Sequence, residues 1–200
     1  MTRSSSPIVE TLALFVIVAC VKFVVATFSL ALAVGLFVLA PPIDVNPWTV
    51  VTSVYAHKNL SHLLSNAIAL VLFGWPVARS TTRARFHAFF VATGAVAGVS
   101  QIVLTDVLAS APLIPATPTA GVVGASGAVF ALMGYLLASN RLSAGVAGLV
   151  DVPRWMVAVL FVAVAIVLTV ATGAPGVALV AHFTGLLIGL VAGSRRVLRP

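Results

Sequence analysis

Long apolar runs separated by short polar segments set the pattern of this 200-residue chain. A helix needs about 20 mainly apolar residues to cross the hydrocarbon core of a bilayer, and most of the runs are close to that length. The pattern predicts six membrane spans, at residues 12–39, 57–77, 86–108, 124–138, 155–172 and 177–193. We therefore expect an all-α, polytopic membrane protein that folds as a single domain over residues 1–200.

The first apolar run has a competing interpretation as a secretory signal peptide. Arg3 precedes the run, and the segment Ala31-Leu32-Ala33 resembles a cleavage site. The apolar region of a signal peptide has about 7–15 residues, and this run is roughly twice as long. It therefore predicts a retained, tilted helix, in which Lys22 either snorkels to the interface or faces other helices.

The connections between spans carry further signals. The segment from Pro41 to Tyr55 is expected to be a polar loop, and the prolines before the fourth span exclude a regular helix there. Three tryptophans fall at predicted span ends, where aromatic side chains favour the membrane interface. The prolines are Pro112, Pro115 and Pro118, and the tryptophans are Trp48, Trp75 and Trp155.

Composition supports the membrane assignment and narrows the chemistry. Hydrophobic residues make up 61% of the chain and charged residues 8%, against about 25% charged in an ordinary soluble domain. These values exclude a water-soluble globule, a disordered chain and a coiled coil. Cys20 is the single cysteine, so an internal disulfide framework and a cysteine-based metal cluster are excluded.

The net charge of +7 is explained by topology rather than by nucleic-acid binding. The basic residues lie at the ends of apolar runs and do not cluster with aromatic or glycine-rich segments, so no nucleic-acid partner is expected. Six spans put both termini on one side, and only Lys58 among the basic loop residues then lies on the other side. The positive-inside rule makes the basic side cytoplasmic, and we expect a prokaryotic cell membrane. The basic segments are Arg3, Arg79–Arg85, Arg141–Arg154 and Arg195–Arg199.

Polar residues inside membrane spans are costly and indicate functional sites. Three groups stand out, one each near the outer ends of spans two, four and six. They are His57, His62 and Asn66; Gly124 to Gly127, which includes Ser126; and Ala181 and His182, followed by Gly185 and Gly189.

The three groups are expected to lie at a similar depth below the outer surface of the membrane. At 1.5 Å per residue, His62 and His182 lie roughly 7–8 Å below the outer ends of their helices. The distance from Ser126 to Asn140 is only about 21 Å along a helix, too short for a 30 Å core. Ser126 is therefore expected to begin its helix below the outer surface. The loop before it must then dip into the protein interior, which is allowed only where that loop lines a cavity.

Helix periodicity indicates which residues of each span share one helix face. Ala181, Gly185 and Gly189 form a small-xxx-small pattern that allows close helix contact. On span four, Ser126, Phe130 and Gly134 repeat at four-residue spacing. Close approach of spans four and six would place Ser126 beside His182.

A serine beside an imidazole is an activated nucleophile, because the imidazole accepts the hydroxyl proton as the oxygen attacks a carbonyl. His62, the Asn66 amide and the Ser126 backbone N–H are candidate donors to the resulting oxyanion. No Asp or Glu lies at that depth, so a Ser126–His182 dyad is expected. His57 and His87 lie near span ends and are interpreted as interfacial or structural.

The three motifs together resemble those of the rhomboid family of intramembrane serine proteases, over about residues 48–193. The matching segments are HKNLSHLLSN at 57–66, GASGAVFALMG at 124–134 and AHFTGLLIG at 181–189. The resemblance implies a six-helix core, with Ser126 as nucleophile, His182 as base, and His62 and Asn66 at the oxyanion hole. It also implies single-span membrane proteins as substrates, cut after a small residue, with no metal or cofactor. Gly124, Phe130 and His57 are expected to support the site.

The sequence departs from the family pattern at three places. Thr49 follows Trp48 where bacterial relatives often have arginine, Ala78 replaces a glutamate, and Phe130 replaces the tyrosine that commonly packs on the catalytic imidazole. None of these removes a reacting group. Two alternatives stay open: an inactive rhomboid-like protein that binds transmembrane clients, and a small transporter that uses His62, Asn66 and His182 as a polar pathway.

Overall fold

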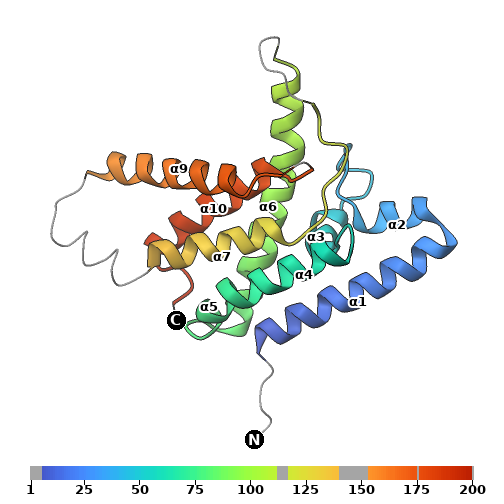
Figure 1. Cartoon of the computed structure of the whole chain (residues 1–200), viewed down its shortest axis with the longest axis horizontal. Helices are drawn as coiled ribbons and strands as arrows, with labels where there is room; N and C mark the ends of the chain where they lie inside the picture. Colours follow the sequence, from blue (N-terminus) through green and yellow to red (C-terminus); the bar gives the residue numbers. More distant parts are fainter. Residues whose placement is uncertain (1–5, 112–116, 140–152, 175, 200) are drawn as a thin grey trace, which may run out of the picture.

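The computed structural model describes residues 6–111, 117–139, 153–174 and 176–199. Within these ranges the chain is helical, with one isolated antiparallel bridge between Leu39 and Val122. The predicted all-α, polytopic membrane fold is confirmed. Figure 1 shows α1 and α9 on opposite sides of the molecule, with α6, α7 and α10 between them. Arg3, Pro112, Pro115, Asn140, Arg141 and Asp151 lie outside the described residues.

The helices differ in length. Pro7–Phe28 (α1), Leu60–Ala78 and α6 (Arg83–Ala109) are long and apolar enough to cross a membrane. The remaining apolar helices are shorter, and α7 has only 14 residues, or about 21 Å. The short fourth span expected from the sequence is therefore present. These shorter helices are α7 (Ser126–Ser139), α9 (Arg154–Ala171) and α10 (Leu179–Ser194).

The prediction of one continuous helix over residues 12–39 is wrong. The helix α1 begins earlier, at Pro7, and ends at Phe28, and a second helix, α2, runs over Leu30–Phe37. Between them Ser29 is extended, with φ −156° and ψ 112°, and its Oγ accepts the Leu32 N–H at 3.2 Å. Serine is a favoured N-cap, so this one residue both ends α1 and begins α2.

The expected polar loop from Pro41 to Tyr55 also contains a helix, α3 (Thr49–Tyr55). Its β-branched residues do not favour a helix, and tertiary contacts override that preference. The Thr52 hydroxyl donates to the Leu36 carbonyl at 2.6 Å, and Trp48 Nε1 donates to the Gly35 carbonyl at 3.0 Å. These bonds join α3 to α2.

The second span begins three residues later than expected. His57 lies in an extended linker, and the helix starts at Leu60, where the Asn59 side chain caps it by accepting the His62 N–H at 2.9 Å. The span consists of α4 (Leu60–Ala69), a π-helical turn (Leu70–Gly74) and α5 (Trp75–Ala78). Lys22 donates to the His57 carbonyl at 2.6 Å, so it faces the other helices rather than the interface.

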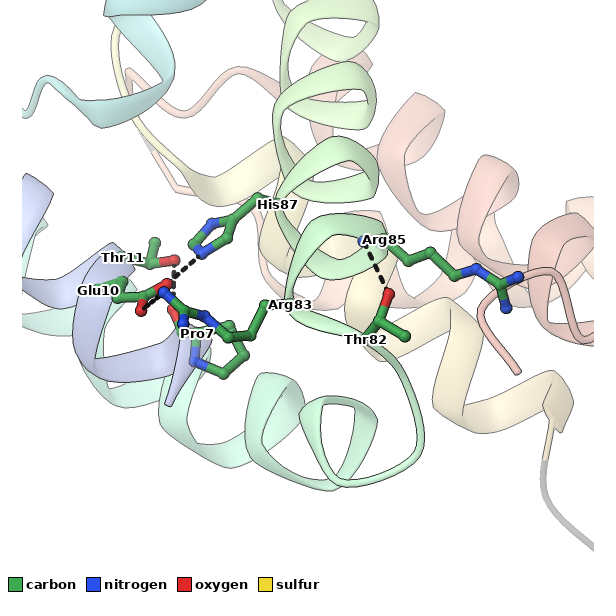
Figure 2. Close-up of polar contacts among 7 residues, drawn as sticks. All are labelled: Pro7, Glu10, Thr11, Thr82, Arg83, Arg85 and His87. Carbon is green, nitrogen blue, oxygen red and sulfur yellow. Dashed lines mark hydrogen bonds and ion pairs between the residues drawn. The ribbon is translucent and has the colours of Figure 1, made fainter. Parts of the chain in front are cut away.

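Polar contacts bring two of the basic segments, Arg79–Arg85 and Arg195–Arg199, together with the start of α1. Glu10 on α1 pairs with Arg83 and with His87, both on α6, and its Oε2 lies 2.8 Å from His87 Nε2 (Figure 2). Arg85 in turn donates to the Arg199 carbonyl. The start of α1, the turn before α6 and the residues after α10 therefore lie together. His87 contacts Glu10 and does not line the cavity described below.

The helices α7 and α10 form the innermost contact. A Cβ atom added at Gly185 would overlap the Gly127 carbonyl, and one at Gly189 would overlap the Ala131 carbonyl. In the other direction, a Cβ at Gly134 would overlap the Leu186 carbonyl. Backbone therefore lies directly on backbone along this pair, which confirms the close approach predicted from the small-residue pattern.

Candidate active site

A cavity of about 930 Å³ opens between α4, α6, α7, α10 and the extended segment 117–123. Four predicted site residues line it together: Ser126, His182, His62 and Asn66. Phe130 lines it as well. The residues that the depth and facing arguments grouped together therefore line one cavity.

Backbone contacts hold the segment that leads to Ser126. Leu39 and Val122 exchange two hydrogen bonds, of 3.0 and 2.8 Å, and the Gly124 N–H donates to the Ser53 carbonyl at 2.9 Å. Ser126 is then the first residue of α7. The backbone N–H groups of a first helical turn have no acceptor in their own helix, so that of Ser126 is a potential donor to the cavity. The expectation that residues before Ser126 line a cavity is confirmed for 117–123.

Gly124 is required by the position of His62. Its φ of +129° is a conformation that side chains rarely adopt. An added Cβ would also lie 2.6 Å from Cε1 of the His62 ring. The glycine therefore lets the imidazole pack directly on the backbone two residues before Ser126.

His182 is the fourth residue of α10 and is only 8% exposed. Its ring stacks on Phe130 of α7, with ring centroids 4.1 Å apart and planes 18° apart. Phenylalanine thus provides the aromatic contact expected at this position, without a hydroxyl. Nδ1 of His182 is buried and has no hydrogen-bond partner among the described residues, and no carboxylate of the described ranges lines the cavity.

His62 is arranged to donate a hydrogen bond into the cavity. The Lys58 N–H approaches its Nδ1 at 3.4 Å. When Nδ1 of a neutral imidazole accepts, the proton is on Nε2, which is then a donor.

Asn66 is buried one helical turn further along α4. One N–H of its Nδ2 donates to the His62 carbonyl at 2.8 Å. An amide nitrogen carries two hydrogens, so a second N–H is left to face the cavity.

His57 lies behind the cavity rather than on its wall. Its ring packs edge-on against Phe15, with ring centroids 4.7 Å apart, and against His62, at 5.2 Å. This placement agrees with a supporting position, because His57 touches the residue that faces the cavity.

Sequence reasoning gave no site role to several polar residues of the cavity wall, among them Lys58, Gln101 and Thr119. Gln101 carried the clearest signal, since it is an amide in the outer part of a membrane span. It was passed over because it belongs to none of the three motifs. The described residues contain no cluster of three or more His, Cys, Asp or Glu side chains that could hold a metal ion.

These features define a polytopic membrane protein with an open cavity that polar side chains of several helices line. The Rhomboid domain family model matches residues 44–198, which is most of the chain. The chain belongs to the rhomboid family. A search of curated protein sequences returned no match.

Proposed function

We propose that this protein is an intramembrane serine endopeptidase that cleaves transmembrane segments through a Ser126–His182 dyad. The observation that carries the proposal is the meeting of Ser126, His182, His62 and Asn66 on one cavity wall. A nucleophile, a base and two hydrogen-bond donors are the parts that peptide-bond hydrolysis requires.

The proposed mechanism assigns one role to each residue. Ser126 Oγ attacks the substrate carbonyl while His182 accepts its proton, and the protonated imidazole then gives that proton to the leaving amine. The oxyanion is bound by His62 Nε2–H, by the Asn66 amide and by the Ser126 backbone N–H. Water then hydrolyses the acyl-enzyme with His182 again as base, so the reaction balances without a metal or cofactor.

Three residues support this site in different ways. Gly124 provides the space in which the His62 ring lies, and the His57 ring packs edge-on against that ring. Phe130 fixes the plane of the His182 ring by stacking. Because His182 Nδ1 has no described partner, stacking takes over the orienting role that a carboxylate has in a triad.

The proposed substrates are single-span membrane proteins, cut after a small residue in the bilayer or just outside it. We place both termini in the cytoplasm of a prokaryotic cell. The contacts of Glu10 with Arg83 and of Arg85 with Arg199 support this orientation, because they gather basic segments at one end of the molecule.

A cleavage assay in detergent micelles tests the activity. Purified wild type is incubated with a single-span substrate whose outer juxtamembrane segment contains small residues, and Ser126 is probed with a fluorophosphonate. We expect cleavage and labelling in wild type, neither in Ser126→Ala, and both in Ser194→Ala, which removes an exposed hydroxyl at the far end of α10. A wild type that binds the substrate but neither cleaves it nor reacts would instead be an inactive, client-binding family member.

Cysteine labelling tests the orientation. In a Cys20→Ala background, a cysteine at Ser80 should react with an impermeant reagent only from the cytoplasmic side, and one at Val45 only from outside. Both positions are exposed. Labelling of both from the same side would overturn the proposed topology.

A further inference from the structure

The helix that carries His182 begins without a cap of its own. Ala178 occupies the N-cap position of α10, and no side chain there bonds the first turn. The first four N–H groups of a helix have no acceptor within the helix. A Ser, Thr, Asp or Asn cap usually supplies one, and its loss costs about 1 kcal/mol.

Gln101 supplies the missing acceptor from another helix. Its side chain, on α6, is 6% exposed, and Oε1 accepts the Ala181 N–H at 3.1 Å. A backbone N–H can only donate, which fixes the orientation of the amide: the oxygen faces α10 and the nitrogen faces away. The bonded residue directly precedes His182.

The other end of the same amide bonds the cavity wall. Gln101 Nε2 donates to Thr119 Oγ1 at 2.9 Å. Thr105, one turn further along α6, accepts the Thr119 N–H at 3.1 Å, and its hydroxyl lies 3.0 Å from that of Thr119. Gln101, Thr105 and Thr119 all line the cavity. One buried side chain therefore links the segment that leads to Ser126 with the first turn of the helix that carries His182.

We propose that Gln101 is a positioning residue for His182: it caps α10 from outside and holds the first turn of that helix in register with the Thr119 wall. This role rests on the proposed function, since it matters for catalysis only if His182 is the base. Gln101 acts through the α10 backbone and is assigned no contact with the reacting atoms. The full role requires a side chain that accepts a hydrogen bond from the Ala181 N–H and donates one to the Thr119 hydroxyl.

Three variants separate the two bonds. Gln101→Leu removes both, Thr119→Val removes only the bond to the wall, and Gln101→Glu retains both when its buried carboxyl is neutral. We expect Gln101→Leu to lower kcat and the rate of fluorophosphonate labelling of Ser126 by about 5–10-fold, as loss of a helix cap implies, with KM within about twofold of wild type. Gln101→Glu should restore both rates to within about twofold. Thr119→Val should lower the labelling rate less than Gln101→Leu does, because the bond to the Ala181 N–H remains.

Thr93→Val is the matched control, because it removes a buried hydroxyl of α6 that bonds only its own helix, at the Phe89 and Phe90 carbonyls. It should change stability without changing labelling. An unchanged kcat in folded Gln101→Leu, or the same loss in Thr93→Val, would overturn the positioning role.

Hydrogen exchange of the Ala181–Gly185 amides gives a readout that needs no catalysis. These amides should exchange faster in Gln101→Leu than in wild type, and their exchange rates should not change in Thr93→Val. Equal exchange rates in Gln101→Leu and wild type would contradict the capping role of Gln101. A wild type that fails to cleave or to react with the fluorophosphonate would refute the proposed function. The exchange rates would then still decide whether Gln101 caps α10.

Discussion

The helix α10 packs on α7 and on α9 in opposite ways. Against α7 its glycines lie on backbone, so that a single added methyl group at Gly185 would overlap the Gly127 carbonyl. Against α9 the contact is made by side chains. Among the described side chains of α9, only Ala165 and Thr169 are buried, and Val167 is 63% exposed. We call the α7–α10 contact, at Gly127, Ala131, Gly134, Gly185 and Gly189, the glycine seam.

This difference explains why a site that needs fixed geometry lies at the α7–α10 contact rather than at the α9–α10 contact. Ser126 and Gly127 are neighbours in the chain, and His182 precedes Gly185 by one helical turn, so both proposed reacting groups lie on the seam. Backbone contacts allow little sliding because neither side has a rotamer that can adapt. The side of α9 that carries Val167 is apolar and exposed, and we expect it to face lipid, where a change of shape is tolerated. The predictions that follow probe each side of this contrast.

The largest effect should come from the reacting groups on the seam. Ser126→Ala and His182→Ala should each lower kcat by about 10⁴-fold or more, and the double variant should be no worse than either, because residues that act as a unit are not additive. Rates and melting temperatures of the purified variants check this. A double variant whose loss is the product of the two single losses would contradict a dyad.

The donors on α4 should have the next largest effect. His62→Ala and Asn66→Ala should each lower kcat by about 10²–10³-fold, the effect of losing one oxyanion donor, and raise KM much less. Asn66→Asp should be worse than Asn66→Ala, because an ionised carboxylate repels the oxyanion.

A structural role of the same residues gives a different result. The Asn66 amide already bonds the His62 carbonyl, so it also holds its own helix. If that were its whole role, melting temperature and kcat would fall in parallel. Slow catalysis with an unchanged melting temperature supports the oxyanion role.

One added methyl group at Gly185 is expected to disrupt the glycine seam. Gly185→Ala forces α7 and α10 apart, at a cost of about 1–3 kcal/mol for overpacking. A displacement of 1 Å between reacting groups costs about 10²-fold in rate, and we expect a loss of that size in kcat.

Gly35→Ala is the matched control, since an added Cβ there meets only the Asn46 side chain, at 3.8 Å. It should leave kcat unchanged and stabilise the protein slightly, by about 0.4–1 kcal/mol. Equal effects of the two substitutions would show that the seam has no special role.

The sequence predicted those features that depend on the number of residues between positions on a helix. Ser126, His182, His62 and Asn66 could be placed on one cavity because the number of residues from a span end gives depth, and a four-residue repeat gives facing. The glycine repeat on the sixth span predicted the seam for the same reason.

Features that depend on the three-dimensional surroundings could not be predicted. The run around Ser29 is apolar apart from Lys22 and Thr27, and a single serine in such a run is not enough to predict the break between α1 and α2. The helix α3 forms from β-branched residues because Thr52 bonds a carbonyl of α2. Gln101 was missed because its two partners, Thr119 and Ala181, are 18 and 80 positions away in the chain.

The smallest effect should come from the α9 side of α10, and it tests the contrast most sharply. Ala165 is fully buried where α9 meets α10, so Ala165→Leu overpacks that contact just as Gly185→Ala overpacks the seam. We expect α9 to give way, because its far side is exposed and apolar, and to do so without moving Gly127 or Gly185. We therefore expect kcat and the labelling rate of Ser126 to stay within about threefold of wild type, against the hundredfold loss in Gly185→Ala. Val167→Leu, on the exposed face, controls for added volume on α9 alone. A loss in Ala165→Leu as large as in Gly185→Ala would mean that α9 helps to hold His182 in place, and that the seam alone does not fix the base.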